Sequence, residues 1–309
     1  MKKISMLKDY IREFGLRLFL LRTMYKISGK FWTERMRKNY FNTFYSFFYN
    51  TCEQTLIRYV DGTMQVPTLP KYVKGKEPIW MLWWQGEKNM PPIVKACVDS
   101  VKRNANGHPV YILDKYSYTR FVTLPKFIIN KQKNPGFKLA FLSDLIRLNL
   151  LEQFGGLWLD ATIYVTKPIK QNVFEQDFFT LDYLDDKYCH GGIWSNFILG
   201  GKYNNIYTFC KEALYQYWQK YDLLIQYFGF DYVLLLAYRN DKTFKAIIDK
   251  RRKCSYDIYA ITKNINEVYN DKLWQKILRS GTFYKIDRRQ IKEKNSGIIK
   301  KILKDDNGY

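Results

Sequence analysis

Histidine and cysteine are scarce in this sequence of 309 residues. Only His108 and His190 occur, so a histidine-based metal cage or a serine-histidine-aspartate relay has little material to draw on. The five cysteines are scattered and never spaced as C-x-x-C, which argues against a disulfide framework and against a zinc site. This cysteine usage fits a reducing compartment best.

Long apolar runs are also missing. No stretch reaches the roughly 20 apolar residues that a membrane-spanning helix needs, and Arg17 and Arg22 bracket the best partial run. The same charges interrupt the apolar core that a cleavable signal peptide requires. We therefore expect a protein that stays on the cytoplasmic side of the membrane.

Acidic residues are few relative to basic ones. The chain carries 51 lysines and arginines against 29 aspartates and glutamates, a formal net charge of +22, and 18% of its residues are aromatic. Summed positive charge attracts nucleic acid, an acidic membrane surface and phosphorylated substrates alike. Composition therefore predicts an anionic partner without choosing among the three.

The amino-terminal part is predicted to form a basic, aromatic-rich helical appendage. Between residues 1 and 28, apolar residues recur at helical spacing, which predicts an amphipathic helix that either lies in a bilayer interface or packs on the protein body. The rings of residues 31–49 suit a membrane belt or a core equally. Turn residues follow, so we divide the chain into an appendage, 1–65, and a catalytic domain, 66–309. The apolar stripe consists of Ile4, Leu7, Ile11, Phe14, Leu18 and Leu21.

A β-α-β pattern opens the second part. The apolar run 79–84 predicts a buried strand, 92–103 a helix, and 109–113 a second strand. This order favours parallel pairing in an α/β sheet, with ligands bound beyond the carboxyl ends of the strands. The loop that begins at Trp84 is therefore an expected ligand contact.

The most informative segment, 138–165, sets ionisable residues in an apolar context. Its pattern predicts a buried helix over 138–154, and Asp144 and Arg147 share one face of that helix. Charges on a buried helix need partners or a polar cavity.

Paired glycines, Gly155 and Gly156, end this helix, and the short apolar strand 157–159 follows. Asp160 comes directly after the strand, where α/β folds bind ligands. We expect its carboxylate to face the same cavity as the two charges on the helix. The alternative is that those two charges pair only with each other and that Asp160 caps a turn.

This stretch resembles the sugar-binding region of glycosyltransferases with a D-x-D motif, in particular glycosyltransferase family 32 and the capsular polysaccharide synthesis proteins. The resemblance runs from about Pro78 to near Tyr284. It implies a GT-A-like, Rossmann-type mixed sheet flanked by helices, and retaining hexosyl transfer from a nucleotide-sugar donor to a growing capsular or surface polysaccharide. The matching residues are Ser143, Asp144, Arg147, Gly155, Gly156, Trp158 and Asp160.

The resemblance also implies roles for individual side chains. Asp144 and Arg147 would bond hydroxyls of the donor sugar, and Asp160 would reach the ribose and the metal-diphosphate. Trp83 matches an indole close to the nucleotide base, and Trp84 is a second candidate for stacking on that base. The alternative for either tryptophan is core packing.

The motif departs from the family pattern at its last position, because the triplet is Asp160-Ala161-Thr162. A threonine hydroxyl is a weak ligand for Mg or Mn. Either Asp160 and Thr162 hold the metal with another carboxylate, for which we choose Asp231, or cationic side chains neutralise part of the diphosphate. Asp231 has two further readings, an acceptor contact and a helix N-cap.

Two further residues complete the predicted site. Asn196 lies in a glycine-rich loop that permits close backbone approach to a ligand, and Lys285 is a candidate to meet the diphosphate. The default for Lys285 in so basic a chain is a solvated side chain.

Acceptor and location follow from these expectations. The acceptor is an oligosaccharide, with a lipid-diphosphate-linked one as a candidate, and an anionic membrane surface on the inner face of the cell membrane is the expected partner. The competing hypothesis is a non-catalytic nucleic-acid or membrane-surface binding protein. Because no recognised nucleic-acid motif occurs, we expect no nucleic-acid partner.

Overall fold

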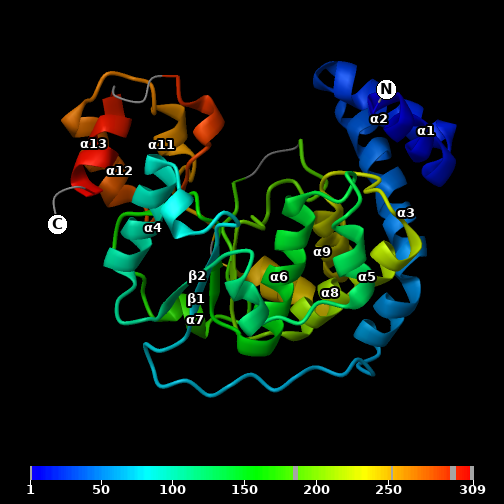
Figure 1. Ribbon diagram of the computed structural model, residues 1–309, viewed down its shortest axis with the longest axis horizontal. Coiled ribbons are helices and arrows are strands. Elements are labelled where there is room, and N and C mark those ends of the chain that lie inside the picture. The colour runs from blue at the N-terminus through cyan, green and yellow to red at the C-terminus, as the bar shows by residue number, and fades with distance from the viewer. Residues whose placement is uncertain (1, 184–186, 252, 293–296, 307–309) are drawn as a thin grey trace.

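The computed structural model describes residues 2–183, 187–251, 253–292 and 297–306. Figure 1 shows helices around a central sheet, with the amino-terminal and carboxy-terminal helices on opposite sides. The helices are α1 Lys2–Phe14, α2 Leu16–Ser28, α3 Glu34–Val60, α4 Pro92–Asn104, α5 Lys126–Lys131, α6 Leu139–Phe154, α7 Asn172–Glu175, α8 Asn205–Lys220, α9 Gly229–Asn240, α10 Lys242–Lys250, α11 Ala260–Lys263, α12 Asp271–Ser280 and α13 Gly297–Asp306. The strands are β1 Ile79–Leu82, β2 Val110–Leu113, β3 Leu157–Leu159, β4 Ile163–Val165, β5 Ile198–Gly200 and β6 Phe283–Lys285.

The central sheet has the strand order β2-β1-β3-β5. β1 pairs in parallel with β2 and β3, whereas β3 pairs antiparallel with β5. The predicted α/β class, a mixed sheet flanked by helices with an amino-terminal helical region, is confirmed. The first strand ends two residues earlier than predicted, because Trp83 and Trp84 enter a turn in which the Gly86 amide donates to the Trp83 carbonyl.

Alternating strand residues divide the core into two layers. Trp80, Trp158 and Leu199 point to the face covered by α3, α6, α8 and α9. Met81 and Leu159 point to the other face, where α4, α12 and α13 pack. Each face is thereby filled by its own set of large apolar side chains.

The amino-terminal segment forms two helices, so the prediction of one continuous helix was wrong. The break lies at Gly15, whose φ of 84° ends α1. Phe14 is buried, and Leu18 and Leu21 pack against the core, so these three residues of the predicted stripe face the protein body, whereas Leu7 is exposed. The side chain of Ile4 lies outside the described residues.

The aromatic segment contributes to the core through α3. Tyr40, Phe44 and Phe48 are buried, and Phe48 stacks on Tyr232 of α9 with ring centroids 5.2 Å apart. For these rings, core packing is therefore the correct alternative. The division of the chain at residue 65 stays a prediction.

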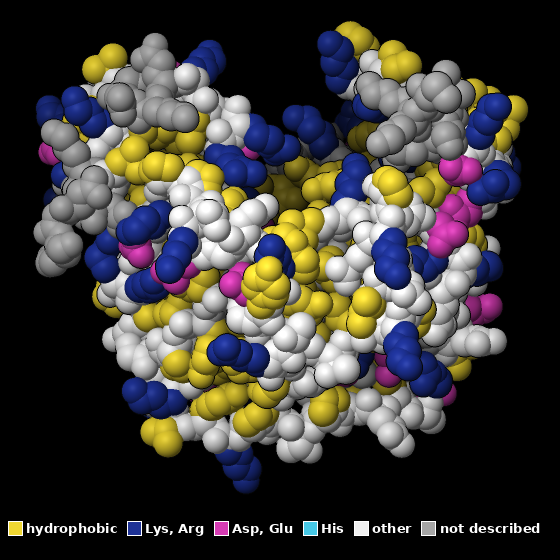
Figure 2. Space-filling model, in the orientation of Figure 1, with side chains coloured by type: hydrophobic (Ala, Val, Ile, Leu, Met, Phe, Trp, Pro, Cys, Tyr) yellow, Lys and Arg dark blue, Asp and Glu magenta, His cyan; other side chains and the backbone are white. Residues whose placement is uncertain are grey.

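The surface is hollowed between the amino-terminal and carboxy-terminal helices, and lysine and arginine side chains rim this hollow (Figure 2). Within the described residues, no helix combines the length and apolar character required to cross a bilayer. All five cysteines are free thiols.

Candidate active site

The paired glycines position the site by closing the turn from α6 to β3. Gly156 has a φ of 83°, and a Cβ at this residue would lie 2.1 Å from the carbonyl oxygen of Pro78. That carbonyl accepts a hydrogen bond from the Leu157 amide at 2.9 Å, which begins the pairing of β3 with β1. Glycine at this position therefore lets β3 enter the sheet and carry Asp160 to its carboxyl end.

Asp144, Arg147 and Asp160 converge, as the sequence predicted. The Nη2 atom of Arg147 lies 3.3 Å from Asp144 Oδ1 and 3.5 Å from Asp160 Oδ1. The guanidinium also stacks over the indole of Trp158, 4.9 Å from the ring centroid, and donates to the carbonyl of Asn196. It is 4% exposed, so its charge depends on these neighbours.

These groups face a cavity of about 300 Å³. A donor sugar with part of its diphosphate fits a space of this size. The cavity is lined by Leu82, Trp83, Ala140, Phe141, Ser143, Asp144, Arg147, Trp158, Asp160, Ala161, Thr162, Asn196, Tyr227, Phe228, Phe230 and Asp231.

Lys285 contacts Asp160 although it follows 125 residues later in the chain. β6 pairs antiparallel with β4 so that Lys285 lies opposite Ile163. The ammonium group is 2.8 Å from Asp160 Oδ2, while the Trp158 indole donates to Asp160 Oδ1 at 3.0 Å. Lys285 is therefore bonded within the site rather than solvated.

The pKa values of the two carboxyl groups next to Arg147 are shifted in opposite directions. Burial raises the pKa of Asp144 to about 6, against the opposing effect of Arg147. Burial acts on Asp160 in the same direction, but Lys285 and Arg147 outweigh it and hold the pKa of Asp160 below its ordinary value. Asp160 is thus ionised at neutral pH.

Asp231 lies in the first turn of α9 with its side chain toward the cavity, so the N-cap alternative was wrong. Its oxygens accept hydrogen bonds from the indole of Trp194 at 3.1 Å and from the side-chain amide of Asn196 at 3.3 Å. Burial raises the pKa of Asp231 to about 7. Burial has the opposite effect on the pKa of His190, which stacks on Trp194, because the protonated imidazole is the charged form, and it lowers that pKa to about 3.

Two of the three residues predicted to hold Mg or Mn accept hydrogen bonds from protein groups, and a metal site at these residues stays a prediction. Both oxygens of Asp160 bond to donors, and those of Asp231 bond to Trp194 and Asn196. Thr162 lines the cavity. Across the described part of the chain, no group of three histidine, cysteine, aspartate or glutamate side chains is arranged to bind a metal ion. Arg147 and Lys285 supply the positive charge at this position.

The two tryptophans predicted near the nucleotide base differ in their position relative to the cavity. Trp83 lines the cavity, and the guanidinium of Arg288 lies 5.4 Å from its ring centroid. Trp84 is not among the lining residues, and its ring stacks on Tyr118 with centroids 5.7 Å apart. Stacking of Trp84 on a nucleotide base is therefore not supported.

Sequence reasoning missed the aromatic wall of the cavity. Phe141 comes from α6, Tyr227 and Phe228 come from the residues just before α9, and Phe230 comes from its first turn. The available signal was the cluster of rings immediately before Asp231.

Comparisons with known proteins bear on the family. No curated protein matches the chain. Among solved structures, a PaToxG glycosyltransferase matches with 17% identity over 70% of this chain and 82% of its own, at a TM-score of 0.40, a likeness too low to indicate activity. The model of the capsular polysaccharide synthesis protein family matches residues 20–303, and the chain therefore belongs to that family.

Proposed function

We propose that the protein is a glycosyltransferase that moves a hexosyl group from a nucleotide-sugar donor to an acceptor of capsular or surface polysaccharide synthesis. The observation that carries the proposal is the convergence of Asp144, Arg147 and Asp160 on one cavity, with Lys285 bonded to Asp160. Family membership supports the same conclusion.

Each side chain has a task in this reaction. Asp144 and Arg147 orient the sugar by bonding its hydroxyl groups, which holds the anomeric carbon in register with the acceptor. Arg147 and Lys285 offset the negative charge that builds on the leaving diphosphate. Asp160 positions both cations and accepts a bond from the ribose, and Trp83 lies beside the base. Retention of configuration follows from the family resemblance.

An anionic membrane surface is the proposed location, and α2 offers the contact. Leu16, Leu20, Met24 and Ile27 are 48–74% exposed and fall within about 80° of one another around the helix axis. The stripe continues into Phe31, and exposed cations such as Arg17 flank it. This face differs from the stripe that the sequence predicted, of which Phe14, Leu18 and Leu21 pack on the protein body. An apolar stripe bordered by cations matches an anionic bilayer interface on the inner face of the membrane.

The test is a screen of UDP- and GDP-sugars for thermal stabilisation and hydrolysis. We expect at least one donor to raise the melting temperature, because a ligand that binds only the folded state stabilises it by about 2.7 kcal/mol at 100 times its dissociation constant.

Asp160→Asn should abolish hydrolysis while leaving the circular dichroism spectrum unchanged. Full hydrolysis in that variant would overturn the site. Indifference to every donor, with salt-sensitive binding of nucleic acid, would favour the competing hypothesis.

A further inference from the structure

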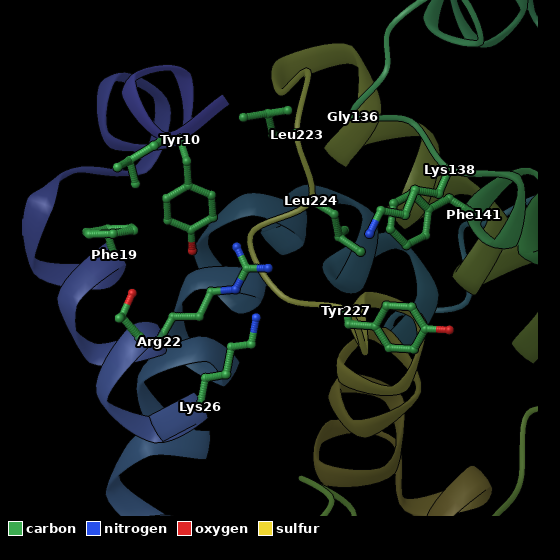
Figure 3. Close-up of a pocket in the computed structure, with 12 residues that line it drawn as sticks. Tyr10, Phe19, Arg22, Lys26, Gly136, Lys138, Phe141, Leu223, Leu224 and Tyr227 are labelled. Carbon is green, nitrogen blue, oxygen red and sulfur yellow. The ribbon is translucent and has the colours of Figure 1, made fainter. Parts of the chain in front are cut away.

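A second cavity, of about 320 Å³, adjoins the first. Phe141 and Tyr227 line both cavities, so the two cavities lie next to each other. Figure 3 shows the second cavity between the amino-terminal helices and the start of α6. It is lined by Leu7, Tyr10, Phe19, Arg22, Thr23, Lys26, Gly136, Lys138, Phe141, Leu223, Leu224 and Tyr227.

Three cations enter this cavity from two walls. Arg22 and Lys26 reach in from α2, and Lys138 comes from the residue before α6 (Figure 3). The guanidinium of Arg22 lies 4.8 Å from the ring centroid of Tyr10. Among the described residues, no carboxylate forms an ion pair with any of the three. Three uncompensated positive charges around one concave space attract an anion with more than one negative oxygen.

The remaining walls of the cavity are largely apolar. Phe19, Leu223 and Leu224 contribute hydrocarbon surface beside the cations. A ligand that satisfies both kinds of wall carries a phosphate or diphosphate group next to an apolar portion. The exposed apolar stripe belongs to the same helix, α2, that supplies two of the cations.

We infer that this cavity binds the phosphate or diphosphate group of a lipid-linked acceptor, and that the sugar end of the acceptor passes Phe141 and Tyr227 into the donor cavity. This inference rests on the proposed function. The amino-terminal helices are then part of the acceptor site, in addition to their contact with the membrane.

The experiment measures binding of farnesyl diphosphate to the full chain by isothermal titration calorimetry, with farnesol as the matched probe that lacks phosphate. We expect Arg22→Gln/Lys26→Gln to weaken binding of farnesyl diphosphate about tenfold or more, because each lost cation removes a charge-assisted hydrogen bond. The control is Arg35→Gln/Lys38→Gln, which removes the same charge from exposed positions on α3 and should keep the affinity within about twofold of wild type. Lys138→Gln, on the opposite wall, repeats the test if α2 does not tolerate two substitutions.

The outcomes separate this inference from the proposed function. Equal affinity of wild type and Arg22→Gln/Lys26→Gln for farnesyl diphosphate overturns the inference, whatever the donor screen shows. Failure of every nucleotide sugar in that screen, with cation-dependent binding of farnesyl diphosphate, overturns the proposed function and the acceptor role and leaves the anion site supported. Phosphatidylglycerol vesicles form the third arm. If the substitutions weaken only vesicle binding, the cations are a lipid headgroup contact and the inference is wrong.

Discussion

At the scale of single residues, Arg147 organises the cavity that we propose binds the donor. Its buried guanidinium lies between two carboxylates and is stacked on Trp158, yet its Nε atom has no hydrogen-bond partner within the described residues. An unpaired buried N–H is costly to leave unmet. Buried donors without a partner are rare, and this one belongs to the residue that lies between the two carboxylates.

Lys285 provides a test of how the diphosphate charge is offset. We expect Lys285→Met to lower the hydrolysis rate of the donor about 10²-fold or more, because a preorganised cation at the leaving group is lost. Lys263→Met, which removes an exposed lysine paired with Asp257, is the matched control and should retain activity.

Hydrolysis by the wild type should persist in a metal chelator. Loss of activity in chelator, with restoration by manganese, would refute charge neutralisation by side chains alone.

Asp231 makes stability depend on pH in a defined direction. Its folded-state pKa of about 7 lies above the value of about 3.9 in an unfolded chain, so the folded state binds the extra proton and the free energy of unfolding falls as pH rises from about 4 to about 7. Asp231→Asn lacks this fall. The stability of the variant relative to wild type should therefore increase from pH 5 to pH 8, by about 1.36 kcal/mol per pH unit up to pH 7.

Urea unfolding at the two pH values measures this difference. The control is Asp249→Asn, because hydrogen bonds from Lys245 and Tyr238 lower the pKa of that surface carboxyl, so its loss should not stabilise the chain at pH 8. A stability difference for Asp231→Asn that is the same at pH 5 and pH 8 would contradict a raised pKa.

At the scale of elements, the site depends on two joins, one a turn between neighbouring elements and the other a pairing between distant strands. The turn from α6 to β3 sets Asp160 behind the helix that carries Asp144, and the pairing of β6 with β4 brings Lys285 across. The first join is local and leaves a sequence signal in its two glycines. The second joins residues far apart in the chain, and the sequence offered Lys285 only against the default of a solvated side chain.

Gly156→Ala tests the first join. We expect a loss of about 3 kcal/mol or more in the free energy of unfolding, because the new Cβ is strained at positive φ and overlaps the Pro78 carbonyl that holds β3. Gly75→Ala is the matched control, since Gly75 has a φ of 82° with open space around its Cβ and bears only the backbone strain of about 1–2 kcal/mol. Urea midpoints measure both. Equal losses in the two variants would show that the overlap is relieved at no cost.

At the scale of the whole molecule, the charge and the apolar stripe of α2 predict how the protein meets a membrane. We expect Leu20→Ser/Ile27→Ser to weaken binding to phosphatidylglycerol vesicles about tenfold or more, because each substitution removes apolar surface that would be buried at the acyl boundary. Ile57→Ser/Val60→Ser, at the far end of α3, removes similarly exposed apolar surface away from the stripe and serves as control. Vesicle sedimentation measures both. Equal binding by the stripe variant and the control would require a different membrane contact.

Point substitutions test this contact better than removal of residues 1–28. Tyr10 and Phe14 are buried, and the Tyr10 hydroxyl donates to the Ile225 carbonyl at 2.8 Å. Deleting the segment would uncover core surface, so a truncated chain would confuse loss of folding with loss of anchoring.

The sequence by itself determined the α/β class and the β-α-β unit, because both follow from local periodicity. Spacing and two glycines raised the convergence of Asp144, Arg147 and Asp160 as one of two alternatives, and the family resemblance favoured it. The tertiary structure alone decided that Lys285 bonds to Asp160, that Asp231 faces the cavity, that Trp84 does not, and which face of α2 is exposed. The physical reason is distance along the chain. Contacts between remote segments depend on how whole elements pack, and a break at one residue, such as Gly15, reorients every side chain beyond it.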